Sequence, residues 1–109
     1  MPVAYLGNTT PSTNTETQIL AESADYDYFV SVVCANKGLG DARVSVYAKA
    51  VGAPETSFMY FVKDQVVSGN TTFETKKLQL ADDHALYVKS SNQNVSFACT
   101  GLRNDKIIE

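Results

Sequence analysis

The chain has 109 residues, of which 44% are hydrophobic and 19% are charged. That length fits one domain with one core, and the composition is typical of a folded globular protein rather than a disordered one. Nine basic and twelve acidic residues give a formal net charge of −3, and the basic residues are scattered along the sequence. Because nucleic-acid binding needs a dense basic patch, we expect no nucleic-acid partner.

The first residues, 1–7, have neither a positively charged start nor a long apolar run, so we expect no signal peptide. No segment approaches the roughly 20 consecutive apolar residues that cross a bilayer, which predicts no association with membranes. The sequence therefore favours a protein that is made in a cytoplasm and used there.

Short runs rich in β-branched and aromatic residues recur along the chain, separated by turn residues roughly every 8–12 positions. No stretch repeats its apolar residues at helical spacing, so no helix is predicted. The expected strands are residues 3–6, 16–22, 28–35, 42–51, 57–62, 71–80, 84–89 and 95–102. About eight short strands predict an all-β fold, an antiparallel β-sandwich of jelly-roll or immunoglobulin-like type, with residues 1–109 as a single domain.

Alternation along the expected strands separates inward from outward side chains. In the fourth strand Val44 and Val46 point inward, whereas Tyr47 and Lys49 point outward. The same parity predicts a core made of Val30, Val32, Cys34, Val44, Val46, Leu78, Leu80, Leu86, Val88, Val95 and Phe97. The fifth strand, 57–62, is apolar on both faces, which predicts a central strand or one that a partner covers.

The two cysteines, Cys34 and Cys99, both lie in apolar runs. They fit two buried thiols that behave as small hydrophobic residues. The alternative is a bridge between two sheets, as in immunoglobulin domains, but those domains also bury a tryptophan against the bridge and this chain has none. A cytosolic origin favours the thiols.

A search for catalytic chemistry finds no converging set of groups. The single histidine, His84, follows Asp82 and Asp83, but neighbours on an extended strand point to opposite faces and do not converge on one metal ion. No serine lies in a Gly-x-Ser-x-Gly context, and no glycine-rich phosphate loop or Cys-x-x-Cys pair is present. We therefore expect no enzyme, no metal and no cofactor.

The six tyrosines mostly fall at outward or ambiguous positions. Tyrosine is common on sheet surfaces and at subunit interfaces, because it combines apolar area with a polar tip. An aromatic platform for carbohydrate, built on Tyr47 and Tyr87, is the rival interpretation. It would make the chain a glycan-binding β-sandwich module.

The N-terminal residues 1–15 have the pattern of an extended arm, because the short apolar strand 3–6 is followed by the polar stretch 8–15. Such a strand can add to the sheet edge of a neighbouring molecule or pair within its own domain, and the sequence leaves both open. Together with the doubly apolar fifth strand and the outward tyrosines, the arm supplies the candidate interface residues Val3, Tyr5, Leu6, Tyr47, Met59 and Phe61.

Five segments, in this order, carry a resemblance that covers nearly the whole chain: Ala4–Gly7, Val30–Asn36, Tyr60–Asp64, Leu78–Val88 and Val95–Gly101. Together they resemble the small β-sandwich structural proteins of tailed bacteriophages, particularly those that infect marine cyanobacteria. One departure is Asp83, where the pattern has Gly-Asp before the strand, which puts the type of that turn in doubt.

The resemblance implies a non-enzymatic protein of the virion, made in the host cytoplasm, that decorates or stabilises the capsid surface. A tail, baseplate or fibre adaptor is the alternative within the same resemblance. Either role implies other virion proteins as partners, repeated copies and a homo-oligomer.

Overall fold

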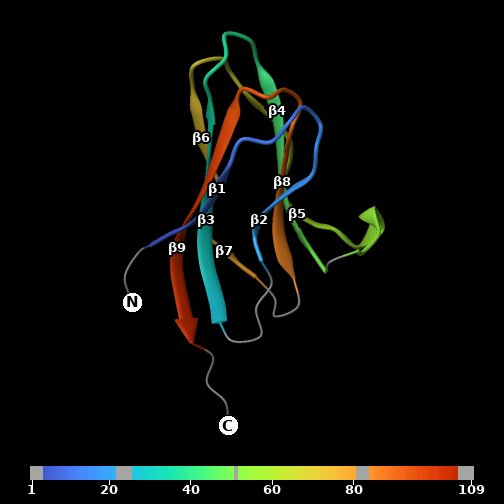
Figure 1. Ribbon diagram of the computed structural model, residues 1–109, viewed down its shortest axis with the longest axis vertical. Coiled ribbons are helices and arrows are strands. Elements are labelled where there is room, and N and C mark those ends of the chain that lie inside the picture. Colours follow the sequence, from blue (N-terminus) through green and yellow to red (C-terminus); the bar gives the residue numbers. More distant parts are fainter. Residues whose placement is uncertain (1–3, 22–25, 51, 81–83, 106–109) are drawn as a thin grey trace.

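The computed structural model describes residues 4–21, 26–50, 52–80 and 84–105, and Figure 1 shows them as an all-β molecule. The elements are β1 (Ala4–Thr9), β2 (Thr17–Leu20), β3 (Tyr26–Asn36), β4 (Ala42–Lys49), the 3-10 turn η1 (Glu55–Ser57), β5 (Met59–Val67), β6 (Thr72–Glu74), β7 (Leu78–Gln79), β8 (Ala85–Ser90) and β9 (Val95–Asp105). No helix among these residues has the length and apolar character that crossing a bilayer requires.

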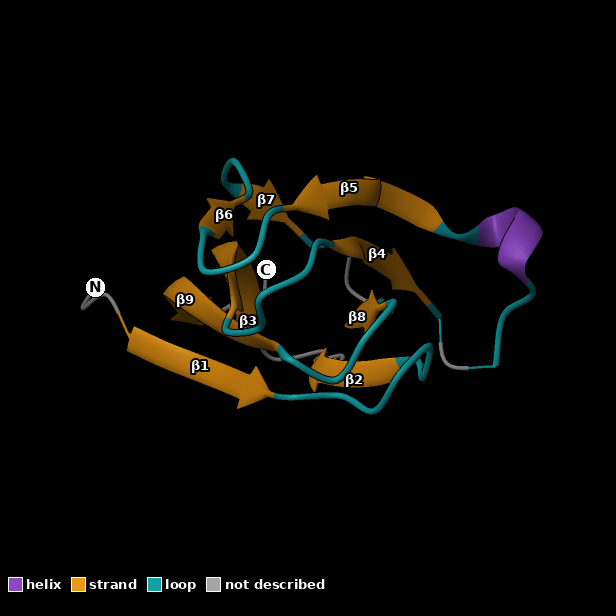
Figure 2. Ribbon diagram, turned by 90° about the horizontal axis from the view of Figure 1, so that it is seen from above, coloured by secondary structure: helices purple, strands orange, loops and turns teal. Residues whose placement is uncertain are grey.

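The strands form two antiparallel sheets that pack face to face, which confirms the predicted β-sandwich (Figure 2). The first sheet has the order β1-β9-β3-β6, and β7 also pairs with β3; the second has the order β2-β8-β4-β5. Since β6 pairs with Val33–Ala35 and β7 with Phe29 and Val30, the two lie end to end along one edge of β3. They occupy a single strand position, which leaves eight positions in all.

The interruption between β6 and β7 explains why 71–80 does not form the single strand that its sequence predicts. Thr75 lies at the break, and its backbone N–H still donates to the carbonyl of Val32 at 3.0 Å. The Thr75 hydroxyl accepts the Val32 N–H at 2.9 Å. The edge therefore bends without leaving the buried backbone groups of Val32 unpaired.

The strand order identifies the sandwich as a jelly roll. The antiparallel pairs β4·β5, β3·β6, β2·β8 and β1·β9 form one long ribbon that starts from the β4–β5 connection. Rolling this ribbon up brings β9 beside β3 and β8 beside β4, and both of these pairs are present. An immunoglobulin domain keeps consecutive strands such as A and B in one sheet, whereas β1, β2 and β3 here alternate between sheets.

The core lies between the two sheets and follows the predicted parity. Of the eleven side chains predicted to form it, ten have exposed fractions of 5% or less, and Leu78 is half-buried against them. Burying one such aliphatic side chain stabilises the folded state by about 1.5–3 kcal/mol. The inward valines of β3 and β4 are therefore a large contribution to the packing of the two sheets.

Both cysteines are buried free thiols, which confirms the preferred of the two predictions from the sequence. The alternative prediction, a disulfide between the two sheets, is wrong. Cys34 and Cys99 lie on neighbouring strands of one sheet, where Val32 pairs with Cys99 and Cys34 pairs with Phe97. Burial raises the pKa of each thiol to about 12.

The strand predicted at 57–62, expected to be central or covered by a partner, is β5, which begins at Met59. It is not central, because it lies at the edge of the second sheet. Its register with β4 shifts between the pairs Val46–Val62 and Tyr47–Tyr60. Such a bulge sets an extra residue on one strand, so that strict alternation fails. Phe61 and Val62, although consecutive, consequently both pack against the main core.

The N-terminal segment pairs within its own chain in this structure. Strand β1 is longer than the predicted 3–6 and lies at the edge of the first sheet beside β9, with Tyr5 opposite Thr100 and Asn8 opposite Ala98. The polar residues after β1 then cross to the second sheet, where β2 begins. Of the two alternatives for the arm, the structure has the one in which its strand completes its own sheet.

Candidate interaction surfaces

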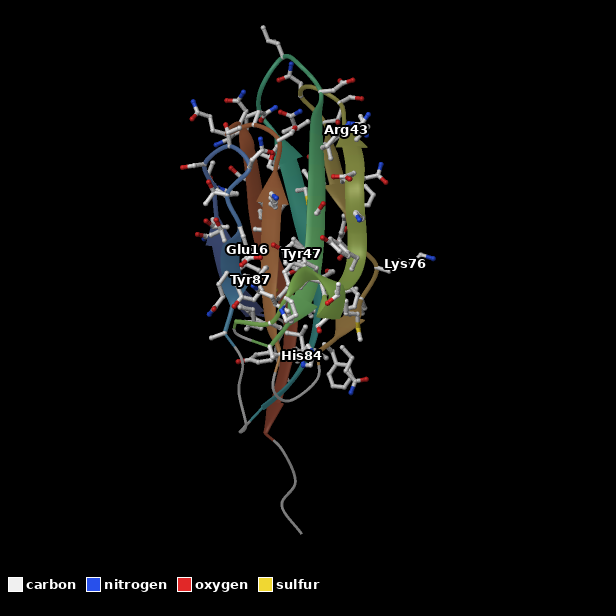
Figure 3. The ribbon with its side chains drawn as sticks, turned by 90° about the vertical axis from the view of Figure 1, so that its right-hand side faces the viewer. Glu16, Arg43, Tyr47, Lys76, His84 and Tyr87 are labelled. Atoms are coloured by element: carbon white, nitrogen blue, oxygen red, sulfur yellow. The ribbon has the colours of Figure 1, made fainter. Side chains whose placement is uncertain are left out.

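The outer face of the second sheet, seen in Figure 3, carries a cluster of aromatic side chains. Tyr47 on β4 lies between Tyr87 on β8 and Tyr60 on β5, because the register pairs it with both. Phe58, from the connection between β4 and β5, stacks on Tyr47 with 4.7 Å between ring centroids and 7° between ring planes. We call Tyr47, Lys49, Tyr60 and Tyr87 the covered face.

Lys49 is held inside this cluster although its side chain is charged. Its ammonium group lies 4.8 Å from the ring centroids of both Phe58 and Tyr87, and 2.8 Å from a carboxylate oxygen of Glu16. The hydroxyl of Tyr47 donates a hydrogen bond to the other oxygen of Glu16. A cation between two aromatic faces and one carboxylate is stabilised even though the residue is only 7% exposed.

The carboxyl group of Glu16 responds to these contacts. Partial burial raises its pKa, but the hydrogen bonds from Lys49 and Tyr47 and the charges of Lys49 and Lys89 outweigh burial, so the pKa lies below its ordinary value. Glu16 is therefore held as the carboxylate and tethers the segment before β2 to the outer face of β4.

These contacts correct the expectation that Tyr47 and Tyr87 are accessible. Their predicted parity is right, since both point away from the core. Their exposed fractions are nevertheless only 2% and 7%, because Phe58 stacks on Tyr47 and the ammonium group of Lys49 lies over the ring of Tyr87. Figure 2 shows the connection that carries Phe58 beside the second sheet. A sugar ring stacking on Tyr47 would find the position taken by Phe58.

A groove of about 530 Å³ opens on the same face, above the covered aromatic side chains, and we call it the outer groove. It is lined by Asn14, Glu16, Arg43, Ser45, Tyr47, Phe58, Tyr60, Lys63, Asp64, Lys89, Ser90 and Ser91. Three of these residues are cationic and two are acidic, in a chain whose net charge is −3.

The outer face of the first sheet has the opposite character. The outward side chains that the structure describes on its two central strands are Phe29, Ser31, Val33, Ala35, Ser96, Ala98, Thr100 and Leu102, and we call them the open face. All eight are partly exposed and none carries a charge. Glu74 lies at the edge of this face on β6, where its carboxylate accepts a hydrogen bond from Ser31 at 3.3 Å.

One end of the sandwich presents an exposed apolar side chain on a firmly held loop. Leu39, between β3 and β4, is 92% exposed. The side chain of Asn36 donates to the carbonyls of Gly40 and Val67 and accepts the N–H of Gly38, each at 2.9 Å. The loop around Leu39 is thus fastened to itself and to the end of β5, which holds the exposed side chain in place.

The structure separates the six residues predicted for an interface. Met59 is 55% exposed, whereas Tyr47 is buried within its own chain, and Leu6 and Phe61 are half-buried against the main core. Tyr5 lies on the edge strand β1, and its side chain is outside what the structure describes.

Val3, the sixth, falls outside the described residues. Of the four predicted residues whose side chains are described, Met59 is the one that is largely exposed. The open face was missed because a partly exposed Val or Ala in a strand has the same sequence pattern as a buried one. Leu39 was missed because it lies in the loop between β3 and β4, where strand alternation does not apply.

The neighbourhood of His84 shows no metal-binding arrangement that the structure can describe. His84 is half-buried just before β8, and Asp82 and Asp83 lie outside the described residues. Among the residues that are described, no group of three or more His, Cys, Asp or Glu side chains is placed to hold a metal ion.

Comparisons with protein-family models, curated proteins and solved structures give no match for this chain. The assignment to the jelly roll therefore rests on the order and pairing of its own strands.

Proposed function

We propose that this protein is a non-enzymatic structural component of a tailed-bacteriophage virion, present in repeated copies that decorate or stabilise the capsid surface. The observation that supports this most is the open face, whose eight described side chains on β3 and β9 carry no charge in a chain of net charge −3. Like-charged copies repel one another wherever their acidic residues meet. The open face lets the middle parts of the two sheets approach without like charges opposite each other, with Glu74 at the edge.

The size of the first sheet also suits association. Its whole outer side, with the open face in the middle and Glu74 at the edge, measures by strand geometry about 30 Å along β3 and about 19 Å across four strand positions, which is roughly 600 Å² per copy. Two first sheets packed together over their whole outer sides would bury about 1,200 Å², the lower limit for a specific interface. A contact of that size is weak for an isolated pair and suits a particle in which every copy makes several contacts.

The fold is compatible with this role without requiring it. Jelly rolls occur in viral capsid domains, in lectins and in cupins, so the fold alone does not select a function. Among these functions, the resemblance of the five segments to phage structural proteins favours a role in the virion. The exposed Leu39, at one end of a molecule measuring 51 × 33 × 19 Å, is our candidate for the contact with other virion proteins.

A tail, baseplate or fibre adaptor is the alternative, and attachment through one end of an elongated domain suits it equally. Binding to separated heads and tails from particles of a phage that encodes this chain distinguishes the two. Co-sedimentation with heads supports capsid decoration, and co-sedimentation with tails supports the adaptor. A protein that sediments with neither overturns the proposal.

A substitution of Leu39 tests whether this residue makes the contact with the particle. Leu39→Ser removes an exposed apolar side chain, so we expect the fold to persist and particle binding to weaken by about tenfold or more. Val66→Ser is the matched control, because Val66 is also exposed, at 41%, but lies on the β5 edge. Equal binding by both variants would remove Leu39 from the contact.

A further inference from the structure

We propose that the outer groove binds an acidic saccharide, with Arg43, Lys63 and Lys89 receiving its carboxylate. This site lies on the second sheet, opposite the open face, and does not depend on the virion role. Its ligand class follows from the charge, the hydroxyl groups and the aromatic wall of the groove.

Charge is the first reason. Glu16 is already engaged by Lys49 at 2.8 Å, so its negative charge is offset within the protein. That leaves Asp64 as the acidic lining residue to set against Arg43, Lys63 and Lys89. The groove is a positive region on an acidic protein, which attracts an anion and disfavours a cation.

The cations are held in position by the sheet. Lys89 on β8 is adjacent to Ser45 on β4 in the strand register. The ammonium group of Lys63 lies 4.9 Å from the ring centroid of Tyr60, and the guanidinium of Arg43 donates to the backbone carbonyl of Asp64 at 3.4 Å. These anchors limit the movement of long side chains, so less conformational entropy is lost when an anion binds.

Two serine hydroxyls add hydrogen-bond donors. The hydroxyl of Ser45 accepts the backbone N–H of Asp64 at 3.0 Å, and the hydroxyl of Ser91 accepts that of Arg43 at 2.9 Å. In both bonds the serine oxygen is the acceptor, so its own hydrogen is left to donate to a ligand. Sugar hydroxyls and carboxylates both accept such bonds.

The volume and the wall of the groove select a sugar among anions. About 530 Å³ falls within the range of small-ligand sites. Phe58 and Tyr60 line it and are half-buried, so part of each ring is available to the C–H surface of a pyranose. A hexuronate residue carries both this apolar surface and a carboxylate at its edge.

The test is an NMR titration of the isotopically labelled full chain with a galacturonic acid trisaccharide, beside its neutral galactose counterpart. We expect the acidic sugar to shift amide signals of residues that line the groove, and the neutral sugar to bind at least tenfold more weakly. Equal binding of the two sugars, signals that shift elsewhere, or no shift at millimolar sugar would overturn the proposal.

Variants show whether the cations are responsible. Lys89→Gln removes one charge from the groove, and we expect affinity for the acidic sugar to fall by about tenfold. Lys76→Gln is the matched control, because Lys76 is exposed and points away from the groove in Figure 3, and it should leave affinity unchanged. An acidic peptide such as hexaglutamate that binds as tightly as the sugar would overturn the saccharide assignment.

Discussion

The two outer faces of this sandwich have the same alternation of inward and outward side chains, but they differ in how much of the outward side chains is exposed. On the second sheet, outward aromatic side chains and Lys49 are buried by the chain's own connection between β4 and β5. On the first sheet, the eight side chains of the open face remain partly exposed and uncharged. Strand parity decides on which side of a sheet a side chain lies, whereas a loop or a partner decides whether water reaches it.

We expect the two faces to have different roles, one in folding and the other in association. The covered face contributes to folding, since Tyr47, Tyr87 and Lys49 are buried within one copy. The open face contributes little to the stability of one copy, and we propose that it contributes to association. Substitutions on the two faces should therefore affect different measurements.

Matched aromatic truncations give the largest expected contrast. Tyr47→Ala empties the middle of the covered face and should lower the free energy of unfolding by about 3 kcal/mol, because a buried aromatic side chain is lost. Phe29→Ala, on the open face, should lower it by about 1 kcal/mol, because the ring is only half-buried. Urea denaturation measures both, and equal losses would contradict the division.

The ion pair on the covered face gives the next effect. Glu16→Gln leaves the buried ammonium of Lys49 without its carboxylate and should lower the free energy of unfolding by about 1.5 kcal/mol. Asp41→Gln, at an exposed loop position, is the control and should have almost no effect. A Glu16→Gln protein as stable as the wild type would show that the pair contributes nothing.

The same carboxyl group predicts how stability depends on pH. Because the pKa of Glu16 is lowered on folding, the unfolded chain takes up the proton first as the pH falls. Its stabilising contribution is present above the ordinary pKa of 4.5 and is lost as the pH falls through the lower pKa of the folded state. Urea midpoints between pH 6 and pH 3 should converge for wild type and Glu16→Gln, and a constant gap would contradict this.

The smallest expected effect concerns the two cysteine thiols, which we expect not to react with a thiol reagent in the native protein. Cys34 and Cys99 lie on the inner side of the sheet that carries the open face, and burial raises the pKa of each to about 12. A thiol reagent at pH 8 should modify neither residue in the native protein and both in denaturant. Rapid modification of the native protein would show that the first sheet opens readily.

The core could be predicted from the sequence because it depends on parity alone. Val30, Val32 and Cys34 alternate within an uninterrupted strand, so their inward direction follows from the pleat. Parity fails at Phe61 and Val62, where a bulge places consecutive residues on one side, and no turn residue marks that bulge. The choice of jelly roll depends on long-range pairing such as β1 with β9, which local patterns do not specify.

The surfaces were less predictable than the core. The outward direction of Tyr47 was correct, but its burial depends on a connection whose path, from Gly52 to Phe58, has no periodic pattern. Arg43, Lys63 and Lys89 are far apart in the sequence and meet only because β5, β4 and β8 are adjacent. The sequence signal for such a groove is limited to the outward direction of these side chains on their strands.

Sedimentation velocity across a range of concentrations tests the open face most directly. Ala98→Lys places a charge in the middle of that face, and Gln65→Lys places the same charge at an exposed position on β5. The account predicts concentration-dependent association for the wild type and Gln65→Lys, and a monomer for Ala98→Lys with unchanged stability. A wild type that stays monomeric throughout, or an Ala98→Lys protein that associates as the wild type does, would contradict it.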